Sequence, residues 1–309
     1  MTKKHRNWLI ALSILAIPFV LFLGCLVFMG EPVPPPAPLP SPNGYDDLVK
    51  AGEMLSDLGG DYDKMNQEEL KKAVSSNAAA VSLSRSGLSN QCRVPIQYSE
   101  SYISNHLDDL ACLNRLARAF VAEGRLAGMQ NRPVDAAKSY LDTIHLGNQM
   151  MHGGLLIDEM LGVADVSLGE RQLQSVVTNL DALACRRAAA SLETLDSQRQ
   201  TWNELMQQEN AWSHGTFGTF PGWRYDIIEW KGNINRWRER KIIKSIITTT
   251  EENFNNQAQK TRRLMLDLAA RAYELDKGHP PASAADLVPD YLKAVPQDPV
   301  TGTNMVHLR

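Results

Sequence analysis

One uninterrupted apolar segment near the N-terminus constrains this chain more than any other feature. Residues 8–29 read WLIALSILAIPFVLFLGCLVFM, 22 residues without a charged side chain. A helix of about 20 apolar residues crosses the roughly 30 Å hydrocarbon layer of a bilayer. We therefore predict a transmembrane anchor at residues 8–29, with the lipid bilayer as its partner.

The charges on either side of this segment predict its orientation. Lys3, Lys4 and Arg6 precede it, and no Lys or Arg follows it before Lys50. Positively charged flanks stay in the cytoplasm. Residues 1–7 are therefore expected in the cytoplasm, and the rest of the chain is expected on the other side of the membrane.

Two alternatives to an uncleaved anchor stay open. A cleaved signal peptide has an apolar region of only about 7–15 residues that ends in small residues, whereas this segment is longer and ends in LVFM. Cys25 follows Leu23 and Gly24, as at a lipoprotein cleavage site, but Phe22 stands where such sites usually carry Leu or Val. We favour the uncleaved anchor, with cleavage or lipidation at Cys25 as the alternative.

A proline-rich linker follows the anchor. Residues 30–43 contain seven prolines, and a polyproline II helix rises about 3.1 Å per residue. The linker is therefore predicted to be a stalk that holds the next domain roughly 40 Å from the membrane. Residues 44–250 are expected to form an exported helical domain, and residues 251–309 a long helix and a compact tail.

The chain beyond the linker has the pattern of an all-α protein. Strand-like alternation never exceeds a few residues, and Ala, Leu, Gln and Glu are frequent. Asn66 and Glu69 predict a capping box that opens a helix to about Leu83, and residues 84–104 are expected to be a loop. The net charge of −3 gives no positive field for nucleic acid, so nucleic acid is not an expected partner.

The clearest helical periodicity lies in the middle of the chain. Apolar residues recur at helical spacing from Leu107 to Val121 and again from Ala136 to Ile144, with a turn around residues 128–133. This hairpin resembles a single tetratricopeptide unit. Because such arrays need about three units, we predict one helical hairpin within a helical bundle.

Further helices are expected along the rest of the chain. An apolar helix should begin after residues 153–154, and two amphipathic helices should follow within residues 170–209. A basic helix is predicted from about residue 226 to 248, and a last long helix from about residue 251 to 275.

Aromatic residues concentrate around a segment that interrupts the helical pattern. Residues 210–225 contain three glycines and a proline, and five of the six tryptophans lie between Trp202 and Trp237. Exposed aromatic side chains bind partners, whereas buried ones would close the end of a bundle, and both interpretations stay open. The candidate partner-binding residues are Trp212, Phe217, Phe220, Trp223, Tyr225 and Trp230.

Sequence signals for catalysis are weak. The chain contains no Walker loop and no GxSxG, GxGxxG, CxxC or HExxH motif. His145 and His152, with Asp158 nearby, are the best candidates for a zinc or hydrolase site, and surface or capping roles are the alternative. We therefore favour a non-catalytic protein without a cofactor.

Three cysteines follow the anchor: Cys92, Cys112 and Cys185. An exported domain permits disulfides. A Cys92–Cys112 disulfide would tie a loop to a helix and contribute on the order of 3 kcal/mol for a closed loop of about 20 residues. Three free thiols are the alternative.

The C-terminal tail carries a family resemblance. A pattern close to KxGxxPxSxxxLxP, followed by a DPxxG turn, is similar to the region after the long helix in the major pseudopilins of type II secretion. Ser283 can cap a short helix with Asp286 at its third position. The residues that carry the resemblance are Gly278, Pro280, Ser283, Leu287, Pro296, Asp298, Pro299 and Gly302.

The anchor departs from the pilin pattern, because it lacks a glutamate at the fifth position and prolines follow it. The resemblance therefore implies no pilin assembly, processing or metal site. The order of anchor, linker, helical body and tail also resembles uncharacterised bacterial single-span envelope proteins. This second resemblance implies a bacterial envelope as the setting but no activity, and together with the predicted anchor it places the protein in the inner membrane. We expect the helical body to bind another envelope protein, through the aromatic segment or the groove of the helical hairpin. We expect a binding or scaffold protein, with a secretion accessory and an envelope hydrolase as alternatives.

Overall fold

The computed structural model describes residues 33–56, 62, 64–217 and 233–306, with the side chains of residues 233–243 left out. Within these ranges the structure is all-α and contains no strand, as the sequence predicts. The predicted anchor at residues 8–29 lies outside the described residues. Among the helices that are described, none is long and apolar enough to cross a bilayer.

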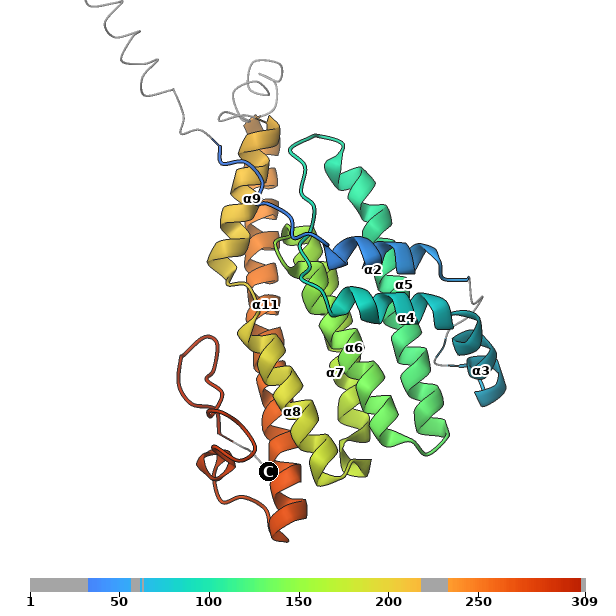
Figure 1. Ribbon diagram of the computed structural model, residues 1–309. Coiled ribbons are helices and arrows are strands. Elements are labelled where there is room, and N and C mark those ends of the chain that lie inside the picture. The colour runs from blue at the N-terminus through green and yellow to red at the C-terminus, as the bar shows by residue number, and fades with distance from the viewer. Residues whose placement is uncertain (1–32, 57–61, 63, 218–232, 307–309) are drawn as a thin grey trace, which may run out of the picture.

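The body is a row of long helices crossed by a layer of short ones (Figure 1). Helix α2 (Gly44–Glu53) and helix α4 (Ala78–Leu88) pack against each other and lie across α5. Asn43 caps α2, because its Oδ1 atom accepts a hydrogen bond from the Tyr45 amide at 3.4 Å. A Cβ atom at Gly44 would lie 2.3 Å from the carbonyl oxygen of Gly87, so a side chain there would force the two helices apart.

The capping box is confirmed, but the helix that it opens is shorter than predicted. Asn66 Oδ1 accepts from the Glu69 amide at 3.1 Å, and Glu69 Oε2 accepts from the Asn66 amide at 2.8 Å. Helix α3 (Gln67–Ser76) then ends at Asn77, and α4 begins beyond it. Because α4 continues to Leu88, the prediction of a loop over residues 84–88 is wrong.

Asn77 divides α3 from α4 through its own side chain. Its Oδ1 atom accepts a hydrogen bond from the Ser56 amide at 2.9 Å, and its Nδ2 atom donates to the Ala73 carbonyl at 3.1 Å. An amide that bonds its own backbone competes with helix continuation. The helical periodicity on either side conceals this break.

The central hairpin is confirmed. Helix α5 (Tyr102–Met129) and helix α6 (Pro133–Met151) are packed together and joined by a short turn. Pro133 opens α6, where its missing N–H is not needed. A Cβ atom at Gly124 would lie 2.3 Å from the Tyr140 ring, so the glycine allows the close packing of the two helices.

Four further helices are described in the second half of the body: α7 (Leu156–Val176), α8 (Ala182–Ser197), α9 (Trp202–Phe217) and α11 (Asn233–Lys277). A short 3₁₀ turn, η1 (Val177–Asn179), joins α7 to α8. The break predicted at residue 210 is absent, because α9 continues to residue 217. The two helices predicted after residue 226 are one 45-residue helix, α11. Residues 233–277 contain neither Gly nor Pro, which leaves no residue that would end it.

The compact tail is confirmed. It folds back along α11 with a single 3₁₀ turn, η2 (Ala284–Leu287) (Figure 1). The Ser283 amide donates to Asp286 Oδ2 at 2.8 Å, as the capping pattern predicts. Asp298 Oδ1 accepts from the Thr301 amide at 2.8 Å, and Gly302 has a φ of +69°, so the predicted turn also forms.

Two large hydrophobic cores hold the body together, beside a small cluster of Leu70, Ala122 and Leu126. The N-terminal core lies among α2, α4 and α5, and includes Tyr45, Tyr102, Phe120 and Trp212. The C-terminal core lies among α6, α7, α8, α11 and the tail. Leucines and alanines dominate it, among them Leu173, Ala189, Leu192, Leu268, Ala269 and Leu287.

Candidate functional site

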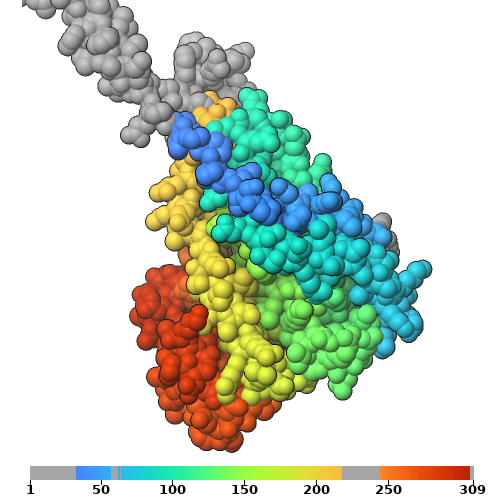
Figure 2. All heavy atoms as spheres, viewed as in Figure 1, coloured from blue at the N-terminus to red at the C-terminus, as the bar shows by residue number. Residues whose placement is uncertain are grey.

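The proline-rich residues lie on the body and do not project from it. We call residues 33–42 the proline strap. Tyr98 Oη donates to the Pro34 carbonyl at 2.9 Å, and the Asn43 side chain pairs with the Arg93 backbone through two hydrogen bonds of 2.9 Å. Figure 2 shows the strap, in blue, against the body beside α9. The expectation of a stalk over these residues is therefore corrected, because hydrogen bonds at both ends fix the strap to the domain.

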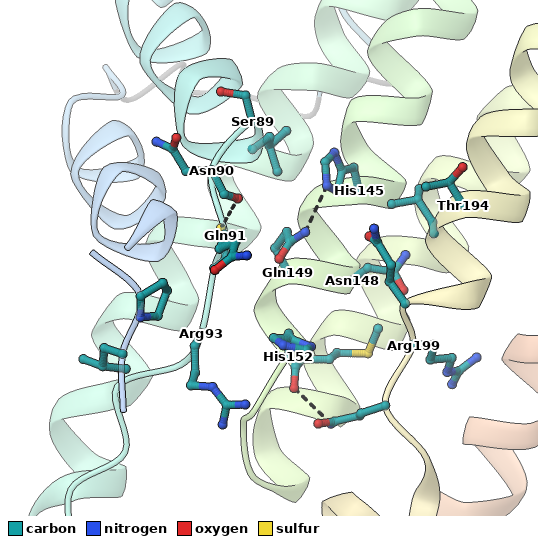
Figure 3. A pocket seen from close by; sticks show the side chains of 18 of the residues that line it. Ser89, Asn90, Gln91, Arg93, His145, Asn148, Gln149, His152, Thr194 and Arg199 are labelled. Carbon is teal, nitrogen blue, oxygen red and sulfur yellow. Dashed lines mark hydrogen bonds between the residues drawn. The ribbon is translucent and has the colours of Figure 1, made fainter. Parts of the chain in front are cut away.

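A groove lies beneath the proline strap. It consists of a cavity of about 780 Å³ and a neighbouring cavity of about 440 Å³. The strap forms one side, residues 89–93 and α6 form the floor and a second side, and the connection from α8 to α9 closes it (Figure 3). We call this the strap groove. Both cavities are lined by Arg93, His152, Gln198, Arg199 and Gln200.

Hydrogen bonds bring three distant segments together at the centre of the strap groove. The His152 carbonyl accepts from the Val94 amide at 3.1 Å. Gln200 Oε1 accepts from the Gly153 amide at 3.2 Å, and its Nε2 atom donates to the Met151 carbonyl at 3.0 Å. The turn after α6 is thus bonded on one side to the segment after α4 and on the other to the segment after α8.

Unpaired amide side chains give the groove its chemistry. Gln91 and Gln198 line it, and neither side chain makes a hydrogen bond within the described part of the chain. Gln149, by contrast, is bonded to His145 at 3.0 Å. A primary amide both donates and accepts. The free amides can therefore bind a polar, uncharged chain.

The two arginines that line the groove differ in whether they have an acidic partner. The Arg199 side chain is only 10% exposed, lies 3.3 Å from Glu159, and stacks 4.0 Å above the Phe254 ring. Burial lowers the pKa of Arg199 and raises the pKa of Glu159. Arg93 has no acidic partner among the described residues, so its guanidinium is free to bind a ligand.

The two candidate histidines both line the strap groove. Burial lowers the pKa of His145. Burial and the nearby Arg93 charge lower the pKa of His152. Both shifts favour the neutral form of the imidazole. In the described ranges, no group of three His, Cys, Asp or Glu residues is placed to hold a metal ion.

Asp158 does not join these histidines. It is fully buried, and His106 Nε2 lies 2.5 Å from its Oδ1 atom. Burial by itself lowers the pKa of His106, but the hydrogen bond and charge of Asp158 outweigh it, so the pKa is raised. His145, His152 and Asp158 therefore belong to two places, and a single site made of all three is not formed.

The His106–Asp158 pair was not predicted from the sequence. His106 lies between the Tyr45 and Tyr102 rings, at centroid distances of 6.3 and 5.0 Å. It joins α5 to the start of α7, where Asp158 Oδ2 also accepts from the Leu155 amide. A usable signal existed, since His106 precedes Leu110 by four residues and lies on the same buried helical face.

Helix α7 is unusual because its buried side is acidic. Asp158, Glu159, Asp165 and Glu170 are all buried. Asp165 Oδ1 accepts from Asn114 of α5 at 2.8 Å, and Glu170 accepts from two side chains of α11. Burial raises the pKa of Asp165 to about 7. Polar bonds to several different elements therefore fix α7 at the centre of the body.

The aromatic candidates divide between core and surface. Trp212 is 9% exposed, lies in the N-terminal core, and donates from Nε1 to the Gln97 carbonyl at 3.1 Å. Phe217 packs edge-on against it at 5.7 Å and is 40% exposed. Phe220, Trp223, Tyr225 and Trp230 lie outside the described residues. For Trp212 the structure agrees with the core interpretation.

The proposed Cys92–Cys112 disulfide is not formed, and both thiols are free. Cys92 packs beside Gly44 and Cys112 beside Gly52. Eight helical residues separate these glycines, which is about 12 Å along α2. A disulfide needs Cβ atoms about 3.5–4.5 Å apart, so the crossing of α2 keeps the two cysteines apart.

Comparison with family models, with curated proteins and with solved structures finds no match to this chain.

Proposed function

We propose that this protein is a membrane-anchored envelope protein with a non-catalytic binding function. Residues 8–29 anchor it, the helical body lies outside the cytoplasm, and the strap groove binds an extended polar ligand that belongs to an envelope partner. The free Arg93 guanidinium beside unpaired amides carries this proposal, because charged and amide groups left without partners in a part-buried groove are available to a ligand.

The same groove argues against the hydrolase alternative. That alternative uses His145, His152 and Asp158 as one site, but Asp158 is bonded to His106 in the interior. His145 is bonded to Gln149, a residue of its own helix. The groove therefore offers hydrogen bonds for recognition, and among the described residues neither of its histidines is hydrogen-bonded to a carboxylate that would orient it as a general base.

The tail supports a second candidate function, that of an accessory to a type II secretion or pilus-like machine. The capped 3₁₀ turn at Ser283 and the turn at Asp298 have the geometry that the pseudopilin-like pattern implies. Purification of the full chain from its own cells in mild detergent tests this candidate. Recovery of secretion-machine subunits supports it, and their absence counts against it.

Membrane topology is tested by protease accessibility. Full-length protein with a C-terminal tag is expected to resist alkaline extraction from membranes. The tag should be degraded when protease reaches the outer face of the inner membrane in permeabilised cells. A tag that stays intact until the inner membrane is broken would overturn the proposed orientation.

Ligand binding is tested by photo-crosslinking in cells. A benzoylphenylalanine residue in place of Gln198, which lines the groove, is expected to give a discrete adduct whose mass includes a cellular partner. The matched control replaces Arg187, which is exposed on α8, the helix that ends just before Gln198, and lies outside the groove. The same adducts at both positions, or none at either, would contradict the proposal.

A further inference from the structure

We infer that the ligand of the strap groove is an extended, proline-rich polypeptide segment, and that the chain's own proline strap occupies part of its binding site. This inference rests on the proposed binding function and names its ligand class. It follows from the chemistry of the strap, the donors of the groove and the space left between them.

The strap shows which chemistry this surface accepts. Residues 33–42 read VPPPAPLPSP, with six prolines. Proline has no backbone N–H, so such a segment presents carbonyl acceptors and few donors. A surface that binds it must therefore supply hydrogen-bond donors, and the bound chain loses little conformational entropy because it is already extended.

The groove contains side chains that can supply such donors. Tyr98 Oη already donates to the Pro34 carbonyl at 2.9 Å. In the same groove, the guanidinium of Arg93 (Figure 3) and the amide of Gln198 have no partner among the described side chains. One end of the groove therefore shows how a proline carbonyl is bound, and the rest has donors of the same kind still free.

The strap leaves room for a second segment. Residues 34–39 are all exposed, and Leu39 keeps 47% of its surface open to solvent. Cavities of about 780 and 440 Å³ remain between the strap and the body. The strap thus lies on the rim of the groove, and a ligand with the same backbone chemistry has space to bind below it or to displace it.

A tethered strap competes with any free ligand. Its attachment at Asn43 holds it near the groove at a high effective concentration, which weakens the apparent affinity for a segment from another protein. The native chain should therefore bind a proline-rich peptide weakly, and a chain without the strap should bind it more tightly.

The test uses the full chain in detergent micelles and a fluorescein-labelled peptide with the strap sequence VPPPAPLPSP. Fluorescence anisotropy measures binding to the native chain and to a variant whose residues 33–42 are a Gly-Ser repeat of equal length. We expect the strap-replaced chain to bind at least tenfold more tightly. The control peptide VGGGAGLGSG, which lacks the extended preference of proline, should bind at least tenfold more weakly than the proline peptide.

A point variant locates the site. Tyr98→Phe in the strap-replaced chain removes only the donating hydroxyl, and we expect peptide affinity to fall about fivefold. Tyr273→Phe, on α11 and outside the groove, is the matched control and should leave affinity unchanged. Equal binding by native and strap-replaced chains, or equal binding of the two peptides, would overturn the inference. A Gln198 crosslink to a partner without peptide binding would leave the proposed function standing and reject only this ligand class.

Discussion

The two large hydrophobic cores of this protein are built from different kinds of side chain. The C-terminal core is aliphatic, and alanines such as Ala189 and Ala269 let α8 and α11 pack closely. The N-terminal core surrounds an imidazole and a carboxylate with aromatic rings, and the hydroxyl groups of Tyr45 and Tyr102 are buried there without a partner in the described structure. Hydrophobic side chains make up the first core, whereas the second also contains a buried titratable pair, His106 and Asp158.

The strap groove lies where these cores meet. Leu88 belongs to the N-terminal core and Leu195 to the C-terminal core, and both line the groove. His152 lies between them at the end of α6, the helix that contributes to both cores. The groove that we propose to bind a ligand therefore lies at the boundary between the two cores, where neither core covers the polar groups of the connecting segments.

The largest expected effect is in the N-terminal core. Asp158→Ala leaves His106 buried without its partner, so we expect the free energy of unfolding to fall by about 3–5 kcal/mol in urea denaturation. Asp109→Ala is the control, since Asp109 lies 3.6 Å from the same ring but is 38% exposed, and it should cost less than about 1 kcal/mol. Equal losses in the two variants would show that the buried pair has no special role.

This loss should also depend on pH. The pKa of His106 is raised in the folded state. The stabilisation from its charged form is therefore complete below its unfolded pKa of about 6.5, and it is lost as the pH rises through the folded pKa. The difference between native and Asp158→Ala chains should accordingly be larger at pH 6 than at pH 9. A constant difference would contradict the charged state of the pair.

The corresponding test in the C-terminal core removes a buried aliphatic side chain. Leu268→Ala empties a fully buried position on α11, and we expect the free energy of unfolding to fall by about 2–5 kcal/mol. Unlike the loss at Asp158, this one should be the same at pH 6 and pH 9, because no titrating group is removed. Leu183→Ala, at a position 56% exposed, is the control and should change stability by less than about 0.5 kcal/mol.

Asp165 on α7 tests how a buried carboxyl group makes stability depend on pH. Its pKa rises from 3.8 to about 7 on folding, so the folded chain holds a proton that the unfolded chain releases between these pH values. Stability should fall as the pH rises from 4 to 7, and Asp165→Asn should remove this fall. At pH 8 we expect the variant to exceed the native chain by on the order of 2 kcal/mol. Parallel stability curves would contradict this assignment.

The smallest expected effect concerns the reactivity of the cysteine thiols. One buried cysteine lies in each core. Burial raises the pKa of Cys92 to about 12 and of Cys185 to about 11, and a protonated thiol reacts slowly. In a Cys25→Ser chain at pH 7.5, maleimide should label Cys112 and leave the other two unmodified. Adding Cys112→Ser should abolish labelling. Rapid labelling of Cys92 or Cys185 would show that its core opens, and failure to label Cys112 without a reductant would indicate a disulfide.

Much of the fold could be predicted from periodicity, but several boundaries could not. The α5–α6 hairpin follows from apolar spacing, and the Asn66 capping box follows from local chemistry. The break at Asn77 depends on a bond to Ser56, 21 residues away. The strap groove was beyond sequence reasoning for the same reason, because hydrogen bonds between distant segments assemble it.

The packing of the strap against the body limits how far the body can lie from a membrane. If residues 8–29 span the membrane, only five peptide links separate Met29 from Pro34, whose carbonyl accepts the first hydrogen bond to the body within the described residues. A fully extended chain of this length reaches at most about 18 Å. The ends of α9 and α11 also lie at the end of the body where the strap begins (Figure 1). A short tether would therefore hold the body with that end facing the lipid. Only ligands within a thin layer beside the bilayer would then reach the strap groove.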